Sequence, residues 1–342
     1  MVRPMFVRFW GVRGSYPVPG SATCRYGGHT PCVQVCPDDD SIVILDAGTG
    51  LRRLGKELVG DALRGAAVSK RGDRRATACG RGEGHCHLLV SHTHWDHIQG
   101  LPFFAPLYVP GNRVTIYGRQ REVHLGDIFA GQTQDPYFPV SLQDVGAAVG
   151  YRELIEGTRF RLGESVTVSC ARLNHPYIAV GYRVDADGGS LAYISDTAPF
   201  DRIVLGCEFV PTSPDLDQAP PEEEVAVLRA MRAGVLELCQ GVDLVIFDTM
   251  FEMREYHAYP HWGHSAPEHA VAIAEEAGAR ALALFHHHPD RSDDQQDAIL
   301  ARVVASTSLE VIAAREGLEV GCTGAGIEVR QTPLRRGSRE GG

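Results

Sequence analysis

One short segment near position 90 constrains this chain more than any other, because it gathers metal-binding side chains at the end of an apolar run. The segment is Ser91-His92-Thr93-His94-Trp95-Asp96-His97, and it directly follows His87-Leu88-Leu89-Val90. The apolar run predicts a short buried strand, so the cluster stands where a strand ends and a turn begins. Alternation along an extended segment points His92 and His94 to the same side. Imidazole and carboxylate are ligands of zinc, iron and manganese, so the segment predicts a metal site.

Other apolar strands in the chain also end in a potential metal ligand. Asp196 follows residues 191–195, Asp248 follows residues 244–247, and His286 follows residues 281–285. His175 lies in a loop before the next predicted strand. Taken singly, each has an ordinary structural interpretation, since an aspartate after a strand often forms a turn. Strand ends converge at one edge of a sheet, so together these residues predict a site with two metals.

The composition fits a globular enzyme whose partner is not a long nucleic acid. The chain has 342 residues, 44% of them hydrophobic, and its 33 basic and 43 acidic residues give a net charge of −10. Polynucleotide-binding proteins usually carry a basic surplus, so this charge argues against long RNA or DNA. Nine cysteines without a CxxC pair favour reduced, mostly buried thiols. Neither a signal-peptide pattern nor a membrane-length apolar run is evident, so we expect a soluble, cytoplasmic protein that contacts no membrane.

Predicted strands and helices follow one another in both halves of the chain. Helices are predicted at about 51–63, at 222–239 and at 267–277. The predicted strands are residues 7–12, 32–35, 42–46, 87–90, 114–117, 166–169, 179–184, 191–195, 244–248 and 281–285. This order, without a glycine-rich phosphate-binding fingerprint, indicates an α/β fold whose sheets are covered by helices on their outer faces.

Two segments stand apart from this pattern. Residues 64–84 are rich in arginine, glycine and small polar residues that cannot bury much apolar surface, so we expect a flexible insertion. Capture of an anion at the mouth of the site is the functional alternative for this insertion. The tail 333–342 is basic and glycine-rich, and we expect it to be disordered.

The ordered motifs resemble the metallo-β-lactamase fold superfamily, and within it the phosphodiesterase branch of ribonuclease Z and related cyclic phosphodiesterases. The resemblance runs from about residue 7 to about residue 289. The superfamily motifs match His92, His94, Asp96, His97, His175, Asp196 and His286. The branch adds an acidic residue after a strand and a His-Ser pair opening a helix, which match Asp248 and His264-Ser265. The resemblance implies a four-layer αββα sandwich, with residues 1–332 forming a single hydrolase domain.

The resemblance also implies how the ligands divide between two metals. One metal would be held by His92, His94 and His175. The other would be held by Asp96, His97 and His286, with Asp196 bridging the two. Three adjacent histidines blur the register of the last ligand, and His287 is the alternative to His286. Two Zn²⁺ ions are expected, with Mn²⁺ or Fe²⁺ as alternatives because these ligand types do not discriminate sharply.

Four carboxylate and imidazole residues are candidates for catalytic or supporting roles. Asp96, already a predicted metal ligand, is also a candidate catalytic residue. His264 is the candidate proton donor to the leaving group, and Asp248 would hold its other ring nitrogen and favour the imidazolium. A helix-start role for His264 is the alternative, because Ser265 and Glu268 could form the cap instead. Asp46 resembles a supporting carboxylate of the family, and a turn role for it is equally open.

The function that these residues favour is hydrolysis of a small or cyclic phosphodiester, of the cyclic nucleotide or cyclic ribose phosphate class. One rival is tRNA 3′-end cleavage, whose enzymes carry a long arm between the third and fourth motifs. Only 21 residues separate His175 from Asp196, which is too short for such an arm. A second rival is hydrolysis of a lactone or thioester on the same fold, and a third is a binding module without a metal. The expected partner is the small substrate, and a homodimer is allowed.

Overall fold

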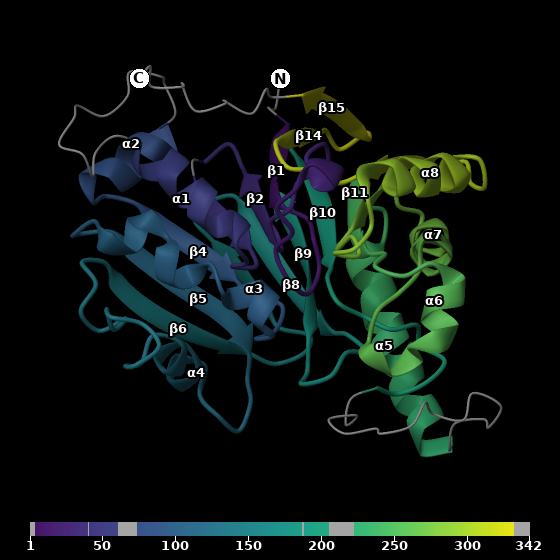
Figure 1. Ribbon diagram of the computed structural model, residues 1–342, viewed down its shortest axis with the longest axis horizontal. Helices are drawn as coiled ribbons and strands as arrows, with labels where there is room; N and C mark the ends of the chain where they lie inside the picture. Colours follow the sequence, from purple (N-terminus) through teal and green to yellow (C-terminus); the bar gives the residue numbers. More distant parts are fainter. Residues whose placement is uncertain (1–3, 40, 61–73, 187, 205–221, 332–342) are drawn as a thin grey trace.

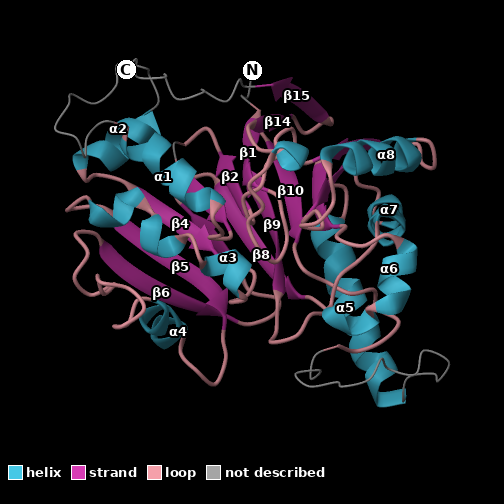
Figure 2. Ribbon diagram, viewed as in Figure 1, coloured by secondary structure: helices cyan, strands magenta, loops and turns pink. Residues whose placement is uncertain are grey.

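Two mixed β-sheets pack face to face, and helices cover their outer faces (Figure 1, Figure 2). The computed structural model describes residues 4–39, 41–60, 74–186, 188–204 and 222–331. One buried apolar cluster lies between the sheets. Each sheet also packs against its helices through a further cluster of its own. The predicted α/β fold with four αββα layers is therefore confirmed.

The first sheet carries the strands that lead into the His92 segment. Within the described residues its strands are β1 (Met5–Gly11), β2 (Cys32–Cys36), β3 (Ile42–Leu45), β4 (His85–Leu89), β5 (Arg113–Arg119), β6 (Ala148–Leu154), β14 (Leu318–Cys322) and β15 (Ile327–Gln331). Their spatial order is β15-β14-β1-β2-β3-β4-β5-β6. Strands β3 to β6 run parallel, and the other neighbours run antiparallel. The ends of β3 and β4 therefore lie at the same edge of the sheet.

The second sheet repeats this plan with the later part of the chain. Its described strands are β7 (Arg159–Leu162), β8 (Val166–Arg172), β9 (Val180–Ala186), β10 (Gly189–Ile194), β11 (Leu244–Asp248), β12 (Ala281–Phe285) and β13 (Glu310–Ala313). Their order is β13-β12-β11-β10-β9-β8-β7. Strands β10 to β13 run parallel, and β7 to β10 are joined antiparallel. The carboxyl ends of β10, β11 and β12 consequently share one edge.

Strands buried on both faces are the ones that the sequence predicts best. Strands β3, β11 and β12 are buried at every position, and each reads as a nearly continuous apolar run. Parallel strands between two covering layers have this pattern because neither face meets water. The sequence did not predict β6, β7, β13, β14 or β15, and β14 was missed although all of its residues are buried. Strands β6, β7, β13 and β15 lie at the outer edges of their sheets, and the side chains along β7 alternate between charged and apolar residues.

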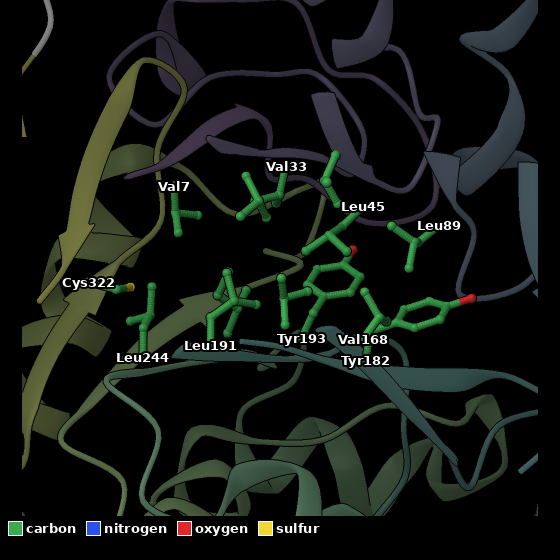
Figure 3. Close-up of a cluster of buried hydrophobic side chains, with 14 of the residues drawn as sticks. Val7, Val33, Leu45, Leu89, Val168, Tyr182, Leu191, Tyr193, Leu244 and Cys322 are labelled. Carbon is green, nitrogen blue, oxygen red and sulfur yellow. The ribbon is translucent and has the colours of Figure 1, made fainter. Parts of the chain in front are cut away.

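The core between the sheets also reaches the edge where the predicted ligands lie. Figure 3 shows side chains of both sheets meeting in this layer, among them Val7, Leu45, Leu191 and Tyr193. Burying an aliphatic or aromatic side chain of this kind stabilises a fold by about 1.5–3 kcal/mol. Tyr193 is fully buried, yet its hydroxyl donates to Asp46 Oδ2 at 2.7 Å. The apolar core therefore holds a hydrogen-bond donor at the position of a candidate site residue.

Helices lie on the outside of both sheets (Figure 2). The described α-helices are α1 (Gly50–Val59), α2 (Arg74–Arg81), α3 (Trp95–Ile98), α4 (Leu125–Gln132), α5 (Glu222–Cys239), α6 (Met253–Ala258), α7 (Pro267–Glu276) and α8 (Asp293–Val304). Short 3₁₀ turns occupy η1 (Ser21–Thr23), η3 (Leu101–Phe103), η4 (Ala105–Tyr108) and η5 (Pro260–Trp262). Helix α1 ends earlier than predicted because Gly60 takes a left-handed φ of 55°. None of the helices in the described ranges is long and apolar enough to cross a membrane.

The segment predicted as a flexible insertion, residues 64–84, falls only partly within the described residues. Its later part includes helix α2, where Cys79 is fully buried and its sulfur lies 3.9 Å from that of Cys86 on β4. Cys79 packs into the apolar cluster despite the polar composition of the helix, which is why the sequence did not reveal it. Residues 61–73 and the tail 333–342 lie outside the described residues, so flexibility there stays a prediction.

Candidate metal centre

The predicted ligands meet at the edge where the parallel strands of both sheets end. His92 follows β4 of the first sheet, whereas Asp196 and His286 follow β10 and β12 of the second. These segments are far apart in the sequence, but the sheets stack with these ends together (Figure 1). The structure therefore brings together every residue of the predicted ligand set, in two adjoining groups.

The first group consists of three histidines. The candidate ligand atoms of His92, His94 and His175 all lie within 4.8 Å of one another. His175 Nε2 is 3.0 Å from His94 Nδ1. Burial lowers the pKa of all three imidazoles, and it lowers that of His175 to about 3. Neutral imidazoles keep a lone pair for a metal, so this group is suited to hold a cation.

The second group mixes carboxylates with imidazoles and is fully enclosed. Ligand atoms of Asp96, His97, Asp196 and His286 lie within 4.8 Å of one another, and all four residues are buried. Burial would lower the pKa of His97, but the carboxylates of Asp196, Asp96 and Asp46 outweigh that effect and raise it well above its usual range. So much negative charge in a dry pocket favours a bound cation.

Asp196 lies between the two groups. Its Oδ2 is 3.2 Å from His97 Nε2 and 3.7 Å from His92 Nε2, while its Oδ1 is 3.1 Å from His286 Nε2. Histidines of both groups therefore face one carboxylate. This is the position that a carboxylate bridging two metals would take, as the sequence predicts for Asp196.

Two buried nitrogen atoms indicate that the groups fit metal ions. His92 Nε2 and His97 Nε2 are shielded from solvent and have no hydrogen-bond partner. Their Nδ1 atoms are already occupied, by Ser91 Oγ at 3.1 Å and by Asp46 Oδ2 at 2.8 Å. An unpaired buried polar atom costs about 1–3 kcal/mol, which coordination of a cation would remove. Fixing one ring nitrogen also fixes which nitrogen is left for the metal.

Asp46 supports the centre from the end of β3. Its carboxylate accepts hydrogen bonds from Ser91 N, Ser91 Oγ, His97 Nδ1 and Tyr193 Oη at 2.7–2.8 Å. Its backbone also takes a left-handed φ of 60°, which turns the chain after the strand. Of the two roles left open by the sequence, Asp46 thus has both: it forms the turn and orients residues of the centre.

Of the two candidates for the last ligand, His286 and not His287 lies in the His/Asp group. Its side chain faces the centre, while His287 Nε2 lies 2.7 Å from the carbonyl oxygen of Ala314. His286 takes a left-handed φ of 58°. Gly14 packs so closely on its ring that an added Cβ would lie 2.5 Å away. The neighbouring Ser15 N–H donates to Asp96 Oδ2 at 2.8 Å. No ligand pattern in the sequence assigns residues 14 and 15 to the site, although the glycines of this loop are a signal for a close approach.

His264 and Asp248 form a buried pair beside the second group. His264 Nδ1 lies 2.9 Å from Asp248 Oδ2, and its ring centre is 5.1 Å from that of His286. Burial would lower the pKa of His264, but the carboxylate of Asp248 outweighs it and raises the pKa to about 9. Asp248 is held in turn by the backbone N–H groups of Thr197 and Met250. The pair can therefore present a protonated imidazole next to the centre.

One residue that the sequence did not reveal joins the loops of the first group. Arg121 donates from Nη1 to Thr93 Oγ1 at 2.7 Å and from Nη2 to the carbonyl oxygen of Ile178 at 3.3 Å. Thr93 stands between His92 and His94, and Ile178 follows the His175 loop. No sequence pattern points to this contact, because Arg121 lies in a different segment from either loop.

Comparison with known proteins agrees with this geometry. The sequence profile of the Beta-lactamase superfamily domain matches residues 43–208. A ribonuclease Z of Halobacterium salinarum is 27% identical over 261 residues, covering 69% of this chain and 79% of that protein. The region that the profile matches, residues 43–208, includes all of the predicted ligands except His286.

Solved structures show the same fold. The metallo-β-lactamase fold protein YhfI from Bacillus subtilis superposes with a TM-score of 0.59 at 18% identity, covering 93% of this chain and 99% of that one. A diphosphatase of the PhnP family gives 0.55 at 18% identity, with 93% and 99% covered. Yeast PDE1 gives 0.57 at 14% identity, with 94% and 100% covered.

The chain therefore has the metallo-β-lactamase fold, and its residues 43–208 match the profile of the Beta-lactamase superfamily domain. Its relatives include ribonuclease Z, and the chain is a metal-dependent hydrolase of this fold with a dinuclear His/Asp site.

Proposed function

We propose that the protein hydrolyses a small or cyclic phosphodiester, of the cyclic nucleotide or cyclic ribose phosphate class. The observation that carries this proposal is the His264–Asp248 pair beside the dinuclear site. Hydrolysis of a phosphodiester expels an alkoxide, which needs a proton as it leaves. Lactone and thioester hydrolysis depend less on such a donor. Ribonuclease Z and a PhnP-family diphosphatase, both named for reactions at phosphorus, are similar to this chain and support the choice.

The ligand assignment is part of the same proposal. His92, His94 and His175 would hold one metal, and Asp96, His97 and His286 the other, with Asp196 shared. Two Zn²⁺ ions are the expected occupants, with Mn²⁺ or Fe²⁺ as alternatives. When bound, two such cations lower the pKa of water and offset charge that develops on the phosphate oxygens.

The chain's own residues supply orientation and the proton. Asp46 and Ser91 fix the rings of His97 and His92 through their Nδ1 atoms. Since His264 Nδ1 donates to Asp248, its Nε2 is the atom that passes a proton to the leaving oxygen. Asp248 keeps the ring oriented and favours its charged form. His264 then regains a proton from water before the next turnover.

Cleavage of tRNA at its 3′ end is the second candidate function, because the relatives include ribonuclease Z. The structure gives one observation against it. Strands β9 and β10 pair directly as a short antiparallel hairpin between His175 and Asp196, so no protruding arm is inserted at that point. The net charge of −10 also disfavours a long RNA. Four expectations stay predictions: a small substrate, no membrane partner, a homodimer and a cytoplasmic location.

A substrate panel tests the proposal. Bis(4-nitrophenyl) phosphate, a lactone, a thioester and a tRNA precursor would be offered to the metal-loaded enzyme. We expect the diester to be cleaved with the highest kcat/KM, and fast lactone or thioester turnover with slow diester turnover would contradict the proposal. Cleavage of the tRNA precursor at its 3′ end in preference to small diesters would favour the second candidate.

The variant His264→Ala tests the residue that carries the proposal. Loss of a positioned proton donor typically lowers turnover by about 10²–10⁴-fold. We expect this loss with a diester that has a poor leaving group, while metal analysis still finds two equivalents per chain. A 4-nitrophenyl leaving group needs little protonation, so its hydrolysis should fall much less. Equal losses for both leaving groups, or an emptied metal site, would show that His264 is not the donor.

A further inference from the structure

Three aromatic side chains form a connected surface next to His264, and we call Phe251, Tyr259 and Trp262 the aromatic shelf. Phe251 is buried, whereas Tyr259 and Trp262 are 45% and 46% exposed. The ring centres of Tyr259 and Trp262 are 4.8 Å apart, and that of Phe251 is 6.1 Å from Trp262. Single exposed apolar residues are ordinary, but neighbouring exposed rings at the edge of a reaction centre indicate a binding surface.

The shelf is fixed to the metal centre through Gly263. Gly263 follows Trp262 directly and takes a left-handed φ of 80°. Its carbonyl oxygen accepts a hydrogen bond from His175 Nδ1 at 2.8 Å, and an added Cβ would lie 2.4 Å from that same nitrogen. Only glycine allows so close an approach in this conformation. The position of Trp262 relative to the ligand His175 is thereby set by the backbone.

Phe251 connects the shelf to the proposed proton donor. Its ring packs edge to face on His264, with 5.6 Å between ring centres and an angle of 86°. The exposed rings of Tyr259 and Trp262 also pack on Phe251, with 6.2 and 6.1 Å between ring centres. The shelf therefore adjoins, through Phe251, the imidazole that would protonate the leaving oxygen.

We infer that the aromatic shelf binds a planar ring on the leaving-group side of the substrate, and that Trp262 determines this specificity. The inference rests on the proposed phosphodiesterase function. The shelf offers flat apolar faces and no charged group of its own, which is the chemistry that stacks a nucleobase. Stacking on an aromatic side chain contributes enough to change affinity by roughly tenfold per ring. The shelf thus selects a base-bearing phosphodiester over one that lacks a base.

Two matched substrates test the inference. They are adenosine 3′,5′-cyclic monophosphate and the 1-O-methyl riboside 3′,5′-cyclic phosphate, which has the same phosphodiester ring without a base. We expect the native enzyme to prefer the base-bearing substrate by roughly tenfold or more in kcat/KM. In Trp262→Ala this preference should disappear, because kcat/KM should fall much more for the base-bearing substrate than for the baseless one. Trp262→Phe should keep most of the preference, since it retains a ring.

Control measurements separate the inference from the function on which it rests. Tyr137→Ala removes an aromatic residue that is 82% exposed in the segment after helix α4, and it should alter neither activity. Metal content and thermal stability of Trp262→Ala should match the native enzyme. If the native enzyme cleaves bis(4-nitrophenyl) phosphate but treats the two cyclic substrates alike, the inference is wrong and the proposed function stands. The inference is equally wrong if Trp262→Ala keeps the preference, or if it changes only the oligomeric state. If no diester is cleaved, the proposed function itself fails.

Discussion

The two halves of the metal centre differ in charge and in what holds them. His92, His94 and His175 are neutral imidazoles whose pKa values are lowered by burial. The other half carries two carboxylates, and its His97 is also in contact with Asp46. The first half is positioned by a loop carbonyl and by Arg121, whereas the second is positioned by a buried carboxylate and the core.

This difference implies an order of metal affinity. A cation gains more from carboxylates in a buried pocket than from neutral imidazoles in a partly open one, because Coulomb attraction is stronger at low dielectric. His94 is only half-buried, while all members of the second group are enclosed. We therefore expect a chelator to remove the metal of the histidine group first. Three variants below test this asymmetry and a fourth tests stability away from the metals, in order of decreasing effect.

Asp196→Ala should remove the asymmetry altogether, since Asp196 faces histidines of both groups. We expect both metals to be lost and turnover to fall by about 10³-fold or more, because the metals supply several kcal/mol of transition-state stabilisation. Metal analysis after gentle purification measures the first effect, and diester hydrolysis the second. Retention of two equivalents per chain would show that the carboxylate is not shared.

Asp46→Ala should weaken the second half selectively. The substitution leaves the donors of Ser91, Tyr193 and His97 without their acceptor. Loss of such a supporting group lowers metal affinity by roughly 10–100-fold. A two-step chelator titration reads each metal separately. Asp243→Ala is the matched control: this carboxylate is also buried and accepts from Ser190, Gly324 and Gly326, but far from the ligands in the described structure. It should lower the thermal midpoint and leave both metal affinities intact.

Arg121→Ala should weaken only the histidine half. Without the guanidinium, the loops carrying His94 and His175 lose a shared clamp, and we expect the first metal to bind roughly tenfold less tightly. Arg121→Lys should restore part of the affinity, because lysine keeps the charge but lacks the forked donor geometry. Arg119→Ala, which breaks the exposed pair with Glu156, is the control and should change neither step. An equal loss of both metals in Arg121→Ala would contradict the division into halves.

Asp39→Asn should affect stability alone, at the end of the strands away from the metals. Partial burial would raise the pKa of Asp39, but hydrogen bonds from Ser41 and Ser165 outweigh it and lower the pKa to about 2 from an ordinary 3.8. A carboxylate with a lowered folded-state pKa stabilises the fold above its unfolded pKa and loses that contribution as pH falls toward the folded value. Allowing for its exposure to solvent, we expect about 1 kcal/mol at neutral pH. Urea unfolding at pH 6 and near pH 3 should show the difference from the native protein shrinking, while a constant difference would rule out the ionised form as its source.

The ligands could be predicted from the sequence because their signal is local. His92, Asp196 and His286 each end an apolar strand, and parallel strands bring such ends to one edge. Asp248 and His264 followed from the family resemblance, and their 2.9 Å contact joins two segments that the pattern alone does not pair.

The residues that the sequence missed act across long separations. Arg121 and Ser15 touch the centre from loops whose own sequences carry no ligand pattern. The edge strands β6 and β13 escaped because one exposed side dilutes the apolar run. Finding these residues and strands requires knowing which residues are neighbours in three dimensions, which a local sequence pattern does not reveal.

The order of the ligands along the chain has a consequence for biosynthesis. His92, His94 and His175 all precede the last strands of the second sheet, and His286 comes near the end. During synthesis, all three histidines of the first group are therefore present before the second group is complete. A metal bound by these three histidines during translation would be exposed to solvent. The second group is complete only after β12 and His286 have been synthesised, so we expect no hydrolysis before nearly all of the second sheet is present.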